Sequence, residues 1–139
     1  SSSIAPPPGQ TRTWLATAGR NDKSDWGKAM TGSETLARIL QFDLLRAVLQ
    51  PVFRIADGAV FGYEGLVRGP EGSPLQTPAE LFGEADRLGL RVELELAAAR
   101  TVCRHFAQAK LPGFLMVNMS CRAIDRVAQD ADRAVDMMT

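Results

Sequence analysis

A glutamate in the middle of a predicted β-strand constrains this sequence more than any other feature. Two β-rich runs, 50–55 and 60–68, flank the segment 56–58, a short Gly-containing connection typical of a β-hairpin. Strand alternation places one set of side chains on a common face, namely Val60, Gly62, Glu64, Leu66 and Arg68. Burying an unpaired carboxylate among such apolar neighbours costs several kcal/mol. Glu64 therefore needs a cation, a metal ion or water, and the spacing leaves structural and functional interpretations equally open.

Arg68 is the cation nearest to Glu64 along this face. Four strand residues at ~3.3 Å each put their Cα atoms about 13 Å apart. That separation is too long for an easy direct ion pair, so the alternation gives Glu64 no obvious partner within its own strand.

The composition describes one small domain without a membrane span. The chain has 139 residues, is 45% hydrophobic and contains no apolar run long enough to cross a bilayer. Lys plus Arg equals Asp plus Glu at 16 each, which argues against nonspecific binding to DNA, RNA or anionic membranes. No secretory signal pattern opens the chain, so we expect a cytoplasmic protein. Cys103 and Cys121 lack metal-ligand spacing, and we expect free, buried thiols.

The first part of the chain divides into a linker and a helix. Residues 1–32 are rich in Ser, Pro and Gly, and we interpret them as a linker or the tail of an upstream region. Ser33 is a candidate N-cap, and the nearly helical spacing of apolar residues after it predicts a helix over 34–49.

Local signals also place the later elements. Thr77, with proline next and glutamate three residues on, predicts the start of a helix, and a further helix should stop near Lys110. The apolar run 114–120 predicts a strand covered on both faces, with Asn118 inside it. Residues 125–139 predict an amphipathic helix.

The order of hairpin, helices, strand and helix predicts an α/β fold. Its two unusual polar residues, Glu64 and Asn118, lie in or at the ends of strands, where barrel and open-sheet enzymes place their chemistry. The residue pattern alone leaves Asn118 more readily explained as a turn residue after a strand.

Several motifs occur together in a recognisable order: Gln50-Pro51, then Gly62 to Pro70 with Glu64-Gly65-Leu66-Val67-Arg68, then Pro78 to Phe82, Gly89, and Val117 to Ser120. The chain thereby resembles the EAL domain family, with Glu-Gly-Leu in place of the usual signature. The resemblance implies a modified TIM (β/α) barrel whose first strand is antiparallel to the others. It also implies hydrolysis of cyclic-di-GMP to the linear dinucleotide pGpG.

The resemblance assigns roles residue by residue. Glu64 and Asn118 match the family's metal ligands, and the implied cofactor is Mg2+ or Mn2+. Gln50 and Arg68 match substrate contacts. These roles are chemically reasonable, because Mg2+ prefers hard oxygen ligands and the planar guanidinium suits a phosphodiester or a guanine edge.

The resemblance covers about residues 36–125 and implies that 33–139 is the N-terminal portion of an EAL domain with a truncated barrel. The family's later acidic ligands and its lysine have no counterpart here. No catalytic residue is therefore assignable, and we expect the chain to be inactive alone and to self-associate. The implied partners are cyclic-di-GMP and an upstream sensor or GGDEF-type domain. The alternative is a non-hydrolytic cyclic-di-GMP receptor or a protein-interaction module.

Overall fold

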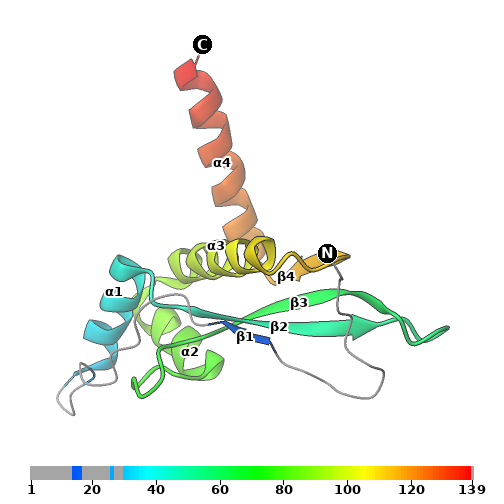
Figure 1. The fold of residues 1–139 in the computed structure, drawn as a ribbon. Helices are drawn as coiled ribbons and strands as arrows, with labels where there is room; N and C mark the ends of the chain where they lie inside the picture. Colours follow the sequence, from blue (N-terminus) through cyan, green and yellow to red (C-terminus); the bar gives the residue numbers. More distant parts are fainter. Residues whose placement is uncertain (1–13, 17–25, 27–29, 139) are drawn as a thin grey trace.

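The computed structural model describes residues 14–16, 26 and 30–138, and these form an α/β fold (Figure 1). The prediction of an α/β fold is therefore confirmed. In chain order the elements are β1 (Trp14–Ala16), α1 (Gly32–Phe42), β2 (Arg46–Phe53), β3 (Val60–Arg68), α2 (Pro78–Leu88), α3 (Arg91–Ala109), β4 (Phe114–Val117) and α4 (Cys121–Met138).

The four described strands form one sheet in the order β1-β2-β3-β4. β2 pairs antiparallel with β1 and with β3, whereas β3 and β4 are parallel and are connected through α2 and α3. The predicted hairpin is confirmed: the Arg54 N–H donates to the Ala59 carbonyl over 2.8 Å, and Gly58 takes a positive φ of 69° in the turn. Its first strand begins earlier in the sequence than predicted.

The predicted helix over 34–49 is wrong in its second half. α1 ends at Phe42, Asp43 adopts a left-handed conformation with its N–H bonded to the Ile39 carbonyl, and β2 begins at Arg46. The N-cap is Thr31 rather than Ser33. Pairing with β1 and β3 on both sides determines the conformation of residues 46–49, because ladder hydrogen bonds outweigh a weak helical preference.

The predicted linker lies largely outside the described residues. Its described part includes β1, which pairs with Ala47–Leu49 of β2. Pro51 lies beyond that pairing, so the backbone donor that proline lacks is not needed by β1.

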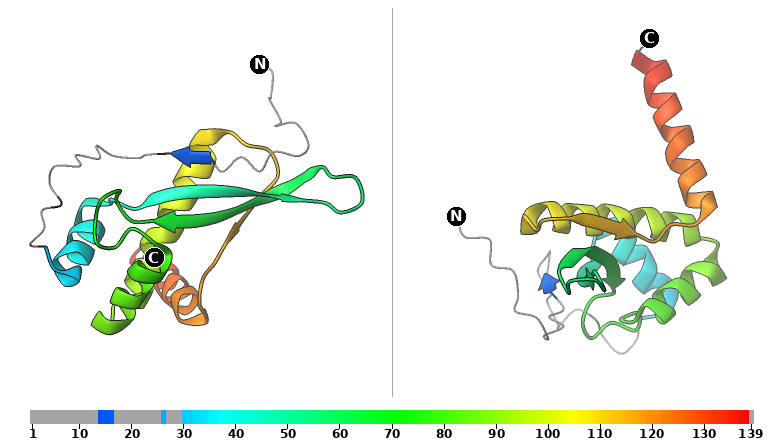
Figure 2. Two further views of the ribbon diagram at one scale, coloured as in Figure 1. Left: turned by 90° about the horizontal axis from the view of Figure 1, so that it is seen from below. Right: turned by 90° about the vertical axis from the view of Figure 1, so that its right-hand side faces the viewer.

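Two apolar clusters meet on α3, which lies along one face of the sheet (Figures 1 and 2). The first joins α1, α2 and α3 and includes the fully buried Leu36, Leu81 and Leu94. The second joins α3 to the sheet through Tyr63 and Val67, the strand face opposite Glu64. Burial on this side of the sheet raises the pKa of Tyr63 above its ordinary value. The face that carries Glu64 is therefore the face that α3 does not cover.

The predicted start of α2 is confirmed. Thr77 accepts a hydrogen bond from the Glu80 N–H, Glu80 bonds back to the Thr77 N–H, and Pro78 opens the helix. The helix ends at Gly89 in a left-handed conformation, and α3 stops at Lys110 as predicted. These ends are determined by local side-chain and backbone chemistry.

β4 and α4 are more exposed than the sequence predicts. Phe114 and Met116 of β4 are 65% and 38% exposed, so this strand is not covered on both faces. α4 begins at Cys121 rather than 125, packs on α3 at its start and projects away from the other elements (Figure 2).

Cys103 and Cys121 are free but exposed, which corrects the prediction of buried thiols. No helix among the described residues is long and apolar enough to cross a membrane.

Candidate functional site

One face of the β2–β3 hairpin is not covered by α3, and we call it the open face. It carries Gln50, Glu64, Arg46 and Arg68 in cross-strand rows. Cross-strand partners share a face, and the register places Gln50 opposite Glu64 in one row. Two residues further along each strand, about 7 Å away, Val48 is opposite Leu66. The next row pairs Arg46 with Arg68.

Asn118 meets Glu64 at the edge of this face. β4 ends at Val117, which is paired with Gly65, the residue after Glu64 in β3. Asn118 is therefore the first residue beyond the sheet, close to Glu64. The Asn118 Nδ2 donates to Glu64 Oε1 over 3.0 Å, although the two residues are 54 positions apart in the sequence. The structure thus brings together the two residues predicted as metal ligands. Glu64 is half-buried on the face that α3 does not cover, and Gln50 opposite it is exposed, whereas Val48 in the next row is buried.

The two predicted substrate contacts lie at different distances from Glu64. Gln50 is its direct cross-strand neighbour. Arg68 lies two rows away, its guanidinium donates to the Val67 carbonyl over 2.9 Å, and it makes no ion pair with any carboxylate within the described part of the chain. Glu64 and Arg68 are therefore separate groups on one surface, as the spacing predicts.

Arg46 is a site residue that the sequence reasoning missed. Its Nε donates to the Gly69 carbonyl over 2.9 Å, which holds its guanidinium at the same end of the sheet as Arg68. Assignment of residues 34–49 to a helix concealed it. The signal that predicts its place is the alternation of Arg46, Val48 and Gln50, which continues the strand pattern upstream of Pro51. Like charges directly opposite each other repel, so this row favours an anion between them.

Glu95 and Ser120 form a second polar contact beside Asn118. Glu95 lies on α3 and is 6% exposed. Its Oε1 accepts from the Ser120 N–H over 2.9 Å, and its Oε2 accepts from the Ser120 hydroxyl over 2.6 Å. The sequence gives no sign of this contact, which joins residues far apart in the chain.

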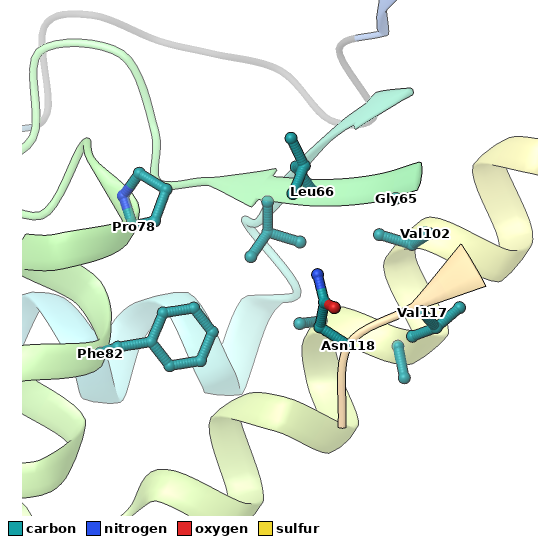
Figure 3. Close-up of a pocket in the computed structure, with 10 residues that line it drawn as sticks. Gly65, Leu66, Pro78, Phe82, Val102, Val117 and Asn118 are labelled. Atoms are coloured by element: carbon teal, nitrogen blue, oxygen red, sulfur yellow. The ribbon is translucent and has the colours of Figure 1, made fainter. Parts of the chain in front are cut away.

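A small cavity lies beside Asn118, between β3, α2 and α3 (Figure 3). Its volume is ≈ 80 Å³, and its lining is almost entirely apolar, from β3, α2, α3 and the end of β4. Pockets that bind drug-sized ligands usually occupy ~300–1,000 Å³, so this cavity is too small for a dinucleotide.

The Glu64–Asn118 pair has the donor chemistry of a partial Mg2+ or Mn2+ site. It offers a carboxylate and an amide oxygen, both hard ligands. Turning the Asn118 amide by half a turn exchanges its nitrogen for its oxygen, so that both groups present oxygen to one point. No cluster of three or more His, Cys, Asp or Glu side chains suited to a metal occurs in residues 14–16, 26 and 30–138. The pair therefore supplies two ligands and leaves the remaining positions to other groups.

Comparisons with protein-family models, with curated proteins and with solved structures each gave no match. The motifs of the sequence and the geometry of the open face are therefore the features that bear on function.

Proposed function

We propose that the chain is the N-terminal portion of an EAL-type cyclic-di-GMP phosphodiesterase, in which Glu64 and Asn118 are two ligands of Mg2+ or Mn2+. The observation that carries the proposal is the 3.0 Å hydrogen bond between Asn118 and Glu64 across the β3–β4 pair. Two residues matched to ligand positions by separate motifs meet at the open face of the same sheet. In the complete domain this site would serve the hydrolysis of cyclic-di-GMP to pGpG.

The topology supports the finer proposal of a truncated, modified TIM barrel. The antiparallel β2–β3 hairpin is followed by β4, parallel to β3, after a helical connection. A barrel grows by pairing a further parallel strand with the last one, and β4 is an edge of the described sheet. In such a barrel the face carrying Glu64 becomes the interior, and exposed apolar groups such as Phe114, Met116 and Val127 become covered.

The open face offers distinct groups for the two parts of a cyclic dinucleotide. Arg46 and Arg68 present planar guanidinium donors, which suit phosphate oxygens. The Gln50 amide, beside Glu64, can donate to and accept from a base edge or a ribose hydroxyl. A bound divalent cation polarises a phosphoryl oxygen and lowers the pKa of a bound water. Glu64 and Asn118 would fix its position relative to the arginine row.

Mn2+ binding by the 139-residue chain tests the ligand assignment. We expect measurable affinity in the parent chain and near-total loss in Glu64→Gln and in Asn118→Ala, because the first change removes the only negative charge of the pair and the second removes the amide oxygen. Isothermal titration calorimetry gives the affinities. Glu93→Gln, at another half-buried glutamate, should bind as the parent chain does. Equal affinity in the parent and both site variants would contradict the assignment.

Turnover tests the proposal that the site is incomplete. We expect no release of pGpG from cyclic-di-GMP by this chain with Mg2+ or Mn2+, since two ligands do not build a two-metal site for in-line attack. Chromatography of the nucleotides over several hours provides the measurement. Release of pGpG that disappears in Glu64→Ala would show that the chain is a complete enzyme and would overturn this part of the proposal.

A non-hydrolytic cyclic-di-GMP receptor is the second candidate, and the Arg46–Arg68 row favours it because two guanidinium groups bind phosphate without a metal. Fluorescence anisotropy of a labelled nucleotide separates the candidates. Binding that persists in EDTA and disappears in Arg46→Ala indicates a receptor site. Binding that needs both a divalent cation and Glu64 indicates the incomplete metal site of the proposed phosphodiesterase. An upstream sensor or GGDEF-type domain fits either candidate.

A further inference from the structure

Both carboxylate oxygens of Glu95 accept hydrogen bonds from a single residue, Ser120. The backbone N–H and the hydroxyl of Ser120 each donate to one oxygen, over 2.9 and 2.6 Å. Glu95 is almost completely buried, and no cation pairs with it in the described ranges. Burying a carboxylate costs several kcal/mol unless hydrogen bonds offset it. These two hydrogen bonds offset the cost of burying the Glu95 carboxylate, and they hold Ser120 against α3.

Ser120 also begins α4. Its hydroxyl oxygen accepts from the Ala123 N–H over 3.2 Å, and its carbonyl accepts from the Ile124 N–H over 3.0 Å. Ser120 is thus the N-cap of α4 and the partner of Glu95 at the same time. A carboxylate near the N-terminus of a helix is also favoured by the helix dipole.

Asn118 lies between two fixed points of the backbone. On one side, Val117 is in register with Gly65 in the β3–β4 ladder. On the other, Ser120 is bonded to Glu95. Only two residues therefore separate the end of the ladder from this anchor. The backbone of Asn118 has little freedom, and its amide reaches Glu64.

We propose that Glu95, acting through Ser120, is a positioning residue that holds Asn118 beside Glu64. We name the Glu95–Ser120 contact the strand-end clamp. Its effect on the Asn118–Glu64 hydrogen bond depends only on the geometry described above. Its effect on binding of a divalent cation rests on the proposed function.

The starts of α1 and α2 show that capping alone does not require this arrangement. α1 and α2 begin at Thr31 and Thr77, whose hydroxyl oxygens accept from the N–H of a glutamate in the first turn, and the exposed carboxylate of that glutamate accepts from the threonine N–H. α4 instead draws a buried carboxylate from a different helix. The clamp thus links α3 to the segment that carries Asn118, a link that a local capping box does not provide.

The side-chain amide signal of Asn118 in a ¹⁵N-correlated NMR spectrum reports the proposed positioning. Ser120→Ala removes the hydroxyl and Glu95→Ala removes the carboxylate; we expect both to move the Asn118 signal toward that of a free, exposed amide. Glu95→Gln keeps one acceptor for the Ser120 N–H and should restore most of the parent shift. Mn2+ affinity should fall about 10–100-fold in Ser120→Ala and Glu95→Ala, the usual cost of losing a group that orients a ligand.

Thr31→Ala is the matched control, because it removes a helix cap of similar energy, about 1 kcal/mol, from α1, which packs on α2 and α3 and does not line the cavity beside Asn118. It should leave the Asn118 signal unchanged. An unchanged signal in Ser120→Ala, or an equal change in Thr31→Ala, would overturn the clamp. If the signal moves as expected while the parent chain binds no Mn2+, the clamp holds and the proposed metal site fails.

Discussion

Replacing Leu94 by alanine should lower the free energy of unfolding by about 2–5 kcal/mol, the usual range for removing a large aliphatic side chain from a core. Leu94 has no exposed surface and belongs to the cluster in which α1, α2 and α3 meet. It also immediately precedes Glu95 on α3. Loss of its packing should therefore weaken both the helical cluster and the support of Ser120.

Urea unfolding followed by circular dichroism measures this effect. Ile55→Ala is the control, because Ile55 lies fully exposed in the turn of the hairpin and its loss should change stability by no more than about 0.5 kcal/mol. If Leu94→Ala proved as stable as Ile55→Ala, the helical cluster would not be the core of this fold.

The features that the sequence predicts correctly are those determined by interactions between residues close together in the chain. The hairpin turn has a glycine at its positive-φ position, and α2 has a threonine, a proline and a glutamate at its first turn. Gly89 and Lys110 likewise end their helices in left-handed conformations. Each of these signals acts within a few residues, so no knowledge of the tertiary fold is needed to use it.

The error over residues 43–49, the second half of the predicted helix, has the opposite origin. The apolar spacing there fits a helix as well as it fits a strand, and only the pairing of Arg46–Leu49 with β1 and β3 decides between them. That pairing joins segments distant in the chain. The same error concealed Arg46, because a residue assigned to a helix has no cross-strand partner.

The sequence points to individual residues of the candidate site, but it does not predict how they are arranged. In the sequence, Glu64 and Asn118 are both unusual polar groups at strands, and the resemblance to the EAL family implies a common role for them. Their contact depends on the parallel register of β3 and β4, which no local pattern encodes. Glu95 is a stronger case, because a buried carboxylate on a helix resembles any other charged helical residue until the fold places Ser120 beside it.

Gly65 is the position at which the chain differs from the Glu-Ala-Leu of the family that it resembles, and here the glycine leaves space for α3. A Cβ placed on Gly65 would lie 1.9 Å from Cγ1 of Val102, which is itself 2% exposed. Val102 is β-branched and on a helix, so it has essentially one available rotamer and cannot turn away cheaply. We expect Gly65→Ala to destabilise the chain by about 1–3 kcal/mol through overpacking.

A double-mutant cycle with Val102→Ala tests this explanation by urea unfolding. Val102→Ala alone should destabilise the chain by leaving a cavity, whereas the added methyl of Gly65→Ala should partly fill that space in the double variant. The double variant should then be more stable than the sum of the single effects predicts, by about 0.5–3 kcal/mol. Because Glu64 points to the opposite face, its bond to Asn118 should survive in the double variant. Simple additivity would show that Gly65 is not matched to Val102 and that strand flexibility alone explains the glycine.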